Sequence, residues 1–177
     1  MHHVLEHTPN PDELLTVCTR LLRPGGLLVT ALPNIESLQA ALGKERWFHL
    51  DLPYHLYHFS ERGLIRILEN HGFRIASVRR FDLEHNPFGW LQTLLNISGI
   101  RENFLFDLLK CAGARRNEYP RVGSKDMLLT FALLPLFAPL SVLFSALESF
   151  ILKRGGTIEV FATKGRTLPP HRKRKAP

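Results

Sequence analysis

The first 81 residues alternate between helix signals and strand signals, and this alternation limits the folds that the chain can adopt. Asn10-Pro11-Asp12-Glu13 has the composition of a helix start: a capping Asn, a first-turn Pro and two acids beside the positive end of the helix dipole. Apolar residues follow at helical spacing until Arg23-Pro24-Gly25-Gly26 ends the helix. The uninterrupted apolar run Leu27–Leu32 then predicts a strand that is buried on both faces.

A second helix and two further strands follow. Ser60 is placed to cap a helix that runs to about His71, and Gly72 ends that helix. Phe73–Phe81 and Thr157–Thr163 have the apolar and β-branched content of strands. Helices that alternate with strands in this way indicate an α/β sheet.

Four short motifs in a fixed order resemble the second half of a class I S-adenosylmethionine-dependent methyltransferase. They are VLEHTPNP (Val4–Pro11), LLRPGGLLVTALPN (Leu21–Asn34), HLYHFS (His55–Ser60) and the HGF turn His71–Phe73. The resemblance implies an α/β fold with a partial Rossmann-like methyltransferase sheet. In such a sheet Phe73–Phe81 and Ile158–Thr163 would form an antiparallel pair at one edge.

The same resemblance divides the chain into four parts. Residues 1–81 correspond to the C-terminal half of the methyltransferase core, and residues 155–164 to its last strand. Residues 82–154 are interpreted as a helical, apolar insertion with a hairpin, and residues 165–177 as a basic disordered tail.

The sequence lacks the glycine-rich loop that holds the cofactor in this family, because no G-x-G pattern occurs in it. Met1–Leu5 is interpreted as the last residues of a strand that begins earlier. The resemblance therefore implies an enzyme fragment that, alone, binds S-adenosyl-L-methionine weakly or not at all.

Glu6, His7 and His55 are the candidate catalytic residues. By resemblance, the backbone at His3 and Val4 would line the methionine part of the cofactor, while Glu6 and His7 would face the acceptor. An unperturbed histidine pKa of about 6.5 suits His7 to act as a general base for a hydroxyl or amine. The alternative is that Glu6 and His7 hold the next loop through hydrogen bonds.

A second interpretation of these residues is a metal site. His3, Glu6 and His7 share one face if the segment turns helically, and His55 could supply a fourth ligand. This arrangement resembles the E-x-x-E-H segment of small-RNA 2′-O-methyltransferases, which use a divalent metal. Because His3 replaces the first Glu of that pattern, the primary prediction is a site without a metal.

Trp47, Tyr57 and His58 are the candidate substrate-binding residues. The resemblance places the segment that contains them over the active site. The alternative is a loop that packs its aromatic side chains onto the sheet.

Met127–Leu147 is strongly apolar, carries no charge, and has about the 20 residues that span a bilayer. Pro135 and Pro139 within it predict a broken helix or a hairpin that dips into one leaflet. Basic residues flank the segment on both sides: Arg115, Arg116, Arg121, Lys153 and Arg154. A buried helical pair or a dimer face is the alternative to this peripheral membrane contact.

The formal net charge of +7 is concentrated partly in the tail, and an anionic membrane is a more plausible partner for that tail than nucleic acid. Two distant cysteines and no signal peptide predict a cytoplasmic protein, at the inner face of the membrane if the apolar segment binds lipid. The leading hypothesis is methyl transfer to an O or N nucleophile of a small or lipid-linked acceptor. The alternative is a non-catalytic, membrane-associated or partner-binding remnant of such an enzyme.

Overall fold

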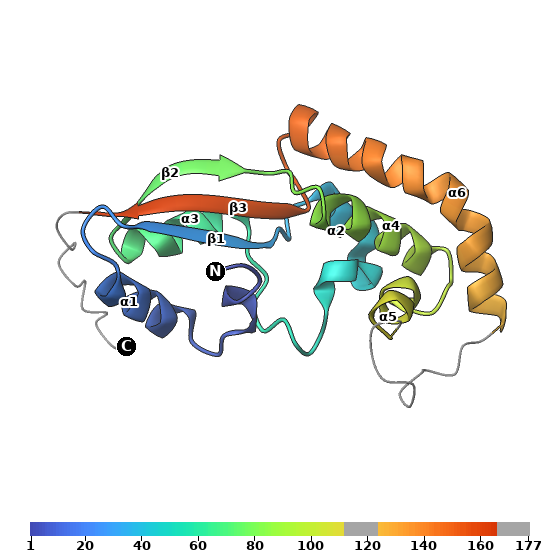
Figure 1. Cartoon of the computed structure of the whole chain (residues 1–177), viewed down its shortest axis with the longest axis horizontal. Coiled ribbons are helices and arrows are strands. Elements are labelled where there is room, and N and C mark those ends of the chain that lie inside the picture. Colours follow the sequence, from blue (N-terminus) through green and yellow to red (C-terminus); the bar gives the residue numbers. More distant parts are fainter. Residues whose placement is uncertain (112–123, 166–177) are drawn as a thin grey trace.

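The computed structural model describes residues 1–111 and 124–165, which form a sheet unit and a helical unit side by side (Figure 1). The predicted basic tail from residue 166 onward and the predicted loop arginines 115, 116 and 121 lie outside the described residues. The strands are β1 (Leu27–Pro33), β2 (Phe73–Arg79) and β3 (Thr157–Lys164). The helices are α1 (Pro11–Leu21), α2 (Leu38–Gly43), α3 (Glu61–Asn70), α4 (His85–Ile97), α5 (Phe104–Cys111) and α6 (Ser124–Ala146).

The three strands form one sheet in the order β1-β3-β2, and β3 is antiparallel to both neighbours. Leu28 pairs with Ala162 in β3, and Arg74 pairs with Thr163 from the other side. The predicted antiparallel pairing of the second and last strands is therefore confirmed. The last strand reaches the sheet only after the long helical excursion, so residues far apart in sequence are hydrogen-bonded neighbours.

Residues Met1–His3 lie along the outer edge of β1, where they form a parallel bridge rather than a full strand. The His3 amide donates to the Ala31 carbonyl at 2.9 Å, and the Ala31 amide donates to the Met1 carbonyl at 2.9 Å. This edge fixes the direction in which the next residues, Val4–His7, leave the sheet.

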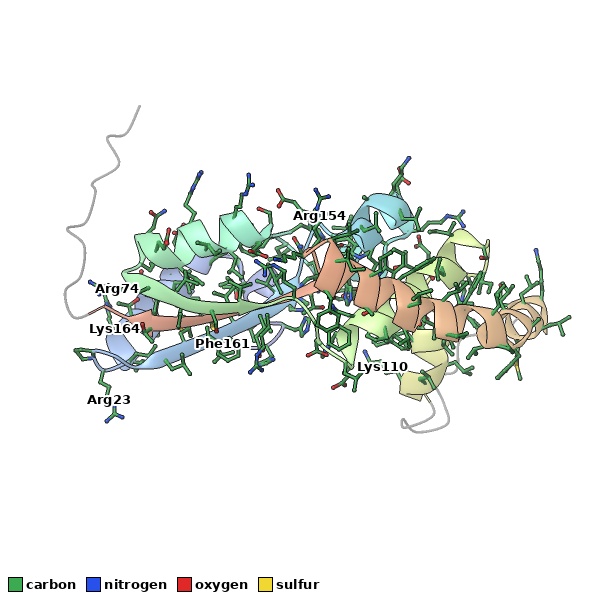
Figure 2. The ribbon with its side chains drawn as sticks, turned by 90° about the horizontal axis from the view of Figure 1, so that it is seen from above. Arg23, Arg74, Lys110, Arg154, Phe161 and Lys164 are labelled. Atoms are coloured by element: carbon green, nitrogen blue, oxygen red, sulfur yellow. The ribbon has the colours of Figure 1, made fainter. Side chains whose placement is uncertain are left out.

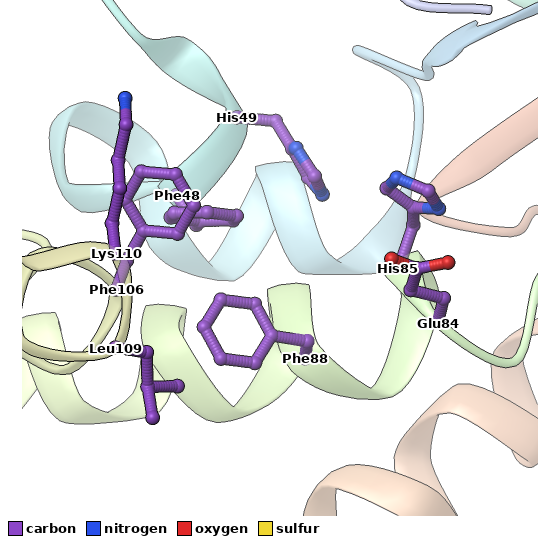
Figure 3. Close-up of a pocket in the computed structure, with 8 residues that line it drawn as sticks. All are labelled: Phe48, His49, Glu84, His85, Phe88, Phe106, Leu109 and Lys110. Atoms are coloured by element: carbon purple, nitrogen blue, oxygen red, sulfur yellow. The ribbon is translucent and has the colours of Figure 1, made fainter. Parts of the chain in front are cut away.

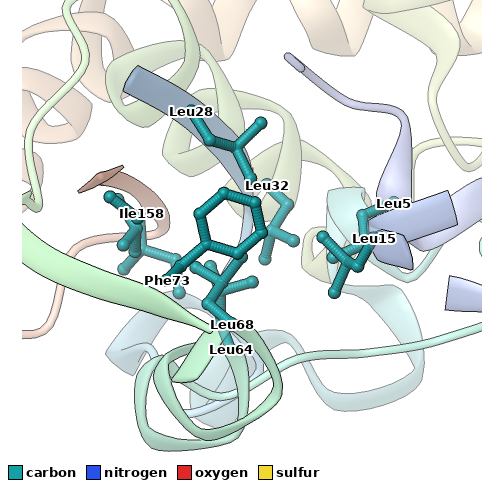
Figure 4. Packing of buried hydrophobic residues seen from close by; sticks show 10 residues of the cluster. Leu5, Leu15, Leu28, Leu32, Leu64, Leu68, Phe73 and Ile158 are labelled. Carbon is teal, nitrogen blue, oxygen red and sulfur yellow. The ribbon is translucent and has the colours of Figure 1, made fainter. Parts of the chain in front are cut away.

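The core of the sheet unit lies between the sheet and two helices, α1 and α3. The helices begin where the sequence predicted: Asn10 Oδ1 accepts from the Glu13 amide at 3.2 Å, and Ser60 Oγ accepts from the Gly63 amide at 3.0 Å. The buried side chains come from both helices and all three strands (Figure 4): Leu5, Leu15, Leu28, Leu32, Leu64, Leu68, Phe73, Ile158, Val160 and Ala162. This packing holds the Leu5–His7 turn against the end of the sheet.

The helical unit is built around α4, which packs along α6 and also contacts α2. A buried polar network joins these helices. Glu148, just after α6, accepts from Trp90 Nε1 at 2.7 Å and from the amides of Leu38 and Gln39 at the start of α2. A smaller apolar core forms between α4, α5 and α6 around Leu95, Ile100, Phe104 and Leu105.

The prediction of a hairpin or broken helix in Met127–Leu147 is wrong. The segment is one helix, α6, which continues into a π-helical turn, Leu147–Ile151 (Figure 1). Pro135 and Pro139 lie four residues apart, so both rings and both missing N–H groups fall on one side of the helix. The opposite side keeps its packing along α4, which explains why the helix is not divided.

Candidate active site

The candidate site lies where the Leu5–His7 turn meets the loop that follows α2. The amides of Leu56 and Tyr57 both donate to the Glu6 carbonyl, at 2.8 and 3.2 Å. These bonds bring His55 beside His7, and the two imidazole rings lie 4.6 Å apart between centroids. The structure therefore brings together Glu6, His7 and His55, which are separated by almost fifty positions in sequence.

Both imidazole rings are oriented by backbone carbonyls. His7 Nδ1 donates to the Tyr54 carbonyl at 2.9 Å, and His55 Nδ1 donates to the His49 carbonyl at 2.8 Å. A carbonyl only accepts, so each ring carries a proton on Nδ1. His55 Nε2 lies 3.8 Å from Asp51 Oδ2. Burial lowers the pKa of His55 below the usual range, although nearby Asp51 and Glu6 oppose this. His55 is therefore neutral at neutral pH, and an imidazole in that state can accept a proton or bind a metal.

Glu6 is buried, with 1% of its surface exposed, and only half of its carboxylate is hydrogen-bonded. Oε1 lies 3.1 Å from His3 Nδ1, whereas Oε2 has no hydrogen-bond partner among the described residues. Glu6, His7 and His55 can each present one ligand atom so that all three lie within 4.8 Å of one another. A buried, unpartnered carboxylate oxygen is costly, and it marks a position where a ligand or a proton donor would be stabilising.

An open pocket of about 530 Å³ lies next to this cluster (Figure 3). Its lining residues come from the loop after α2, from α4 and from α5: Phe48, His49, Glu84, His85, Phe88, Phe106, Leu109 and Lys110. The His85 ring stacks on His3 at 4.6 Å, and His3 in turn contacts Glu6. The pocket and the Glu6–His7–His55 cluster are thus connected through His3.

His49 is the most buried histidine of the pocket. Its Nε2 atom has no hydrogen-bond partner among the described residues. Burial, followed by the nearby His3, His55 and His85, lowers its pKa to about 3, so the ring is neutral at physiological pH. Apolar rings from Phe48, Phe88 and Phe106 contact one another around it and give the pocket an aromatic wall.

The three predicted substrate-binding residues occupy different environments. Trp47 is 3% exposed, and its Nε1 donates to Gln39 Oε1 at 2.9 Å. It therefore packs beneath the pocket residue His49, whose ring it contacts. Tyr57 is exposed, and its hydroxyl donates to the Pro9 carbonyl. His58 Nε2 donates to the Leu50 carbonyl, and its ring lies 6.1 Å from that of His55. Direct contact with a substrate stays a prediction for all three.

The two residues predicted to line the cofactor differ in exposure. His3 is half-buried and has a left-handed backbone, with φ at 49°, whereas Val4 is largely exposed. His49 and His85 were not predicted as site residues. A signal for His85 exists in the sequence, because the tripeptide Leu-Glu-His occurs at residues 5–7 and again at residues 83–85. Both copies place a histidine at the site, whereas nothing local to His49 distinguishes it.

Residues 1–78 match the family model described as a methyltransferase domain. This match covers less than half of the chain, and it agrees with the methyltransferase resemblance that the order of the motifs predicted. The matched part includes Glu6, His7 and His55 but ends before His85 and α4. The aromatic half of the pocket therefore lies outside the matched domain.

The solved structures that resemble the chain include two of low sequence identity. One is the [4+2]-cyclase SpnF, with 18% identity and a TM-score of 0.44 over 93% of this chain and 47% of that protein. The other is a putative sarcosine dimethylglycine methyltransferase from Galdieria sulphuraria, with 10% identity and a TM-score of 0.45 over 93% of this chain and 51% of that protein. The chain thus spans about half the length of each. No curated protein matches the sequence.

Proposed function

We propose that the chain contributes the acceptor-binding half of a methyltransferase that transfers a methyl group to an O or N nucleophile of a small or lipid-linked acceptor. The observation that carries the proposal is the pair of imidazoles beside Glu6, each with Nδ1 bonded to a backbone carbonyl, so that chemistry with an acceptor would fall to Nε2. The match of residues 1–78 to a methyltransferase domain supports the reaction class.

The proposed role of His7 is general base. Its Nε2 lone pair takes the proton of the acceptor hydroxyl or amine as the nucleophile forms its bond to the methyl carbon. Glu6, buried beside it, stabilises the resulting imidazolium, and His55 holds the acceptor in line for displacement. S-adenosyl-L-methionine would supply the methyl group from its sulfonium sulfur. The bond between that sulfur and the methyl carbon would break in the same step.

The fit of the cofactor to this chain is partial. The chain leaves the edge of β1 after His3, and the exposure of the next residue, Val4, is consistent with a ligand beside this backbone. The sequence has no glycine-rich loop for the rest of the cofactor. We therefore expect calorimetry on this chain alone to show binding weaker than micromolar, and micromolar binding would contradict this assignment.

The experiment that tests the function is release of S-adenosylhomocysteine by the complete enzyme with water-soluble and lipid-linked alcohols and amines as acceptors. His7→Ala should lower kcat by about 10²–10⁴-fold, the range of general base catalysis. His55→Ala should also lower kcat, because the acceptor loses its alignment, and neither variant should change cofactor affinity much. His71→Ala is the control, because His71 follows α3 and contacts the Ile67 carbonyl and Asp12 of α1, none of which lines the pocket. If both site variants keep the wild-type rate, His7 and His55 only stabilise the loop structure and take no part in the reaction.

A divalent metal is the second candidate role for the same residues. The 4.8 Å limit on the separations between Glu6, His7 and His55 ligand atoms favours it, because a small contraction would bring all three onto one ion. Imidazoles bonded through Nδ1 to carbonyls also match the usual orientation of metal ligands. Loss of activity on dialysis against a chelator, with recovery on addition of Mg²⁺ or Zn²⁺, would replace the general-base assignment. Unchanged activity would remove the metal.

A further inference from the structure

We infer that the exposed side of α6 rests on an anionic lipid bilayer, with the helix axis along the membrane surface. The helix and its π-helical extension, Lys125–Ile151, are long and apolar enough to cross a membrane by length and composition alone. How the side chains are distributed around the helix decides between crossing the membrane and lying on it.

The polarity of α6 differs from that of an ordinary surface helix, because apolar side chains lie on its inner and its outer side, whereas most of its polar side chains are buried. Small polar residues and one acid face the protein and are buried: Thr130, Ser141, Ser145, Glu148 and Ser149. Large apolar side chains face outward, each more than half exposed: Leu128, Phe131, Leu136, Val142, Leu143, Phe150 and Ile151. Figure 2 looks onto this outward side, with Arg154 beside the carboxyl-terminal end of the helix.

The outward side chains recur at helical spacing over seven turns, so they form one continuous stripe without a charged residue. Soluble monomers rarely expose a contiguous apolar surface of this kind. An apolar outer surface with polar residues inside is instead the arrangement expected when the solvent on the outside is hydrocarbon.

The inner contacts of α6 exclude a spanning helix as long as the fold is intact. Glu148 is bonded to Trp90 and to the start of α2, and Phe144 contacts the Trp90 ring at 5.2 Å. A spanning helix would have to leave these partners and carry a carboxyl group into hydrocarbon. An in-plane helix keeps all of these contacts and immerses only the stripe.

Charges at the two ends of the stripe select an anionic surface. Lys125 is exposed at the beginning of α6, and Lys153 and Arg154 are exposed just beyond its end. Of the two acids in this segment, Glu148 is buried, and Asp126 follows Lys125 at the beginning of the helix, where it accepts from the Arg101 amide. Basic side chains at the headgroup level are attracted to anionic lipid, which favours a bilayer over a second copy of the chain.

The test is flotation of the chain with vesicles of phosphatidylcholine containing phosphatidylglycerol. Leu136→Asp with Leu143→Asp should lower the partition coefficient at least tenfold, because these side chains are 56% and 60% exposed and leave the core untouched. Leu136→Met with Leu143→Met is the matched control and should bind like the wild type. Lys153→Gln with Arg154→Gln should reduce binding to anionic vesicles several-fold and leave the weaker binding to neutral vesicles unchanged.

Circular dichroism and the urea midpoint of each variant establish that the fold is retained. A wild-type chain that stays in the aqueous fraction, or an Asp variant that floats equally well, would overturn the proposal. If the wild type sediments as a dimer and does not bind vesicles, and if the Asp variant is a monomer, the stripe is a contact with a second copy of the chain instead. Protein that resists carbonate extraction from the vesicles would overturn the in-plane orientation.

Discussion

Glu148 joins α6 to the remainder of the helical unit, and replacing it by Gln tests that role. The carboxylate accepts from three donors: Trp90 Nε1 at 2.7 Å on one oxygen, and the amides of Leu38 and Gln39 on the other. A Gln side chain has one acceptor oxygen, so its NH₂ group must face either the indole N–H or the start of α2. One buried donor left without an acceptor costs about 1–3 kcal/mol, and we expect a loss of that size.

The pH dependence of this loss is the sharper part of the prediction. Burial raises the pKa of Glu148 above its usual value, and its hydrogen bonds to Trp90, Gln39 and Leu38 only partly oppose this. The folded pKa is thus higher than the unfolded pKa of about 4.5, so the folded state holds more protons between those two values. The stability linked to this proton is fully present below the unfolded pKa and is lost as the pH rises through the folded pKa. The amide of Glu148→Gln does not titrate. The difference in free energy of unfolding between the wild type and this variant should therefore become smaller as the pH rises.

Urea denaturation followed by tryptophan fluorescence measures both effects, since Trp90 itself reports on the site. Wild type and Glu148→Gln are compared near pH 5 and near pH 8, with Glu36→Gln as a control at an exposed acid two residues before Leu38. The control should show no deficit at either pH. A Glu148→Gln deficit that grows with pH would mean that the ionised carboxylate is the preferred form, and the reasoning from burial would be wrong.

Two further outcomes are expected at the pocket. Burial lowers the folded pKa of His49 to about 3, so the stability linked to this group, which is present above pH 6.5, is lost as the pH falls toward 3. Between pH 6.5 and pH 5 the wild type should lose about 1.6 kcal/mol of its free energy of unfolding through this group, whereas His49→Gln should not, and urea titration at both pH values measures the difference. Equal pH dependence in the two proteins would contradict this. A Cβ at Gly89 would lie 2.7 Å from His49 Nε2 and 2.8 Å from Gln39 Oε1, so Gly89→Ala should lower the free energy of unfolding by about 1–3 kcal/mol. An unchanged urea midpoint would show that these two side chains can move aside without cost.

The parts of the fold that the sequence predicted are those set by local chemistry. Asn10 and Ser60 cap their helices through amides three residues away, and Gly25, with φ at 79°, supplies the turn before β1. Such contacts lie within a few positions along the chain, so residue type and spacing determine them. The antiparallel pairing of β3 was predicted instead from the family resemblance, because its partners β1 and β2 are distant in sequence.

The orientation of α6 could not be predicted, and the reason is physical. Periodicity identifies the buried side of a helix only when the polar side faces water. In α6 the apolar residues surround the helix almost evenly, and the few polar ones, such as Thr130, Ser141 and Ser145, point inward. The two prolines suggested a break, whereas packing along α4 preserves the helix. Only the long-range contact between Glu148 and Trp90 reveals which side is covered.

The pocket escaped prediction for a related reason. His49 lies in the loop after α2 and His85 is the first residue of α4, and neither is near Glu6 in sequence. The stacking of His85 on His3 depends on where α4 begins, and that in turn depends on Asp82 Oδ1 accepting from the Glu84 and His85 amides. Burial then gives His49 its unusual pKa, which residue type alone does not encode.

Helix α4 connects the two proposals. Phe88 lines the pocket, whereas Trp90, two positions later, contacts Phe144 and Glu148 at α6. Residues two apart on a helix point to opposite sides, so α4 alone separates the pocket from α6, and one helix is roughly 10–12 Å thick. A bilayer against the outer side of α6 would hold the pocket a few helix diameters above the lipid surface, within reach of an acceptor group on a lipid-linked carrier. The two proposals together therefore favour the lipid-linked members of the acceptor panel over freely diffusing alcohols and amines. A preference for the water-soluble acceptors would mean that membrane contact through α6 plays no part in the reaction.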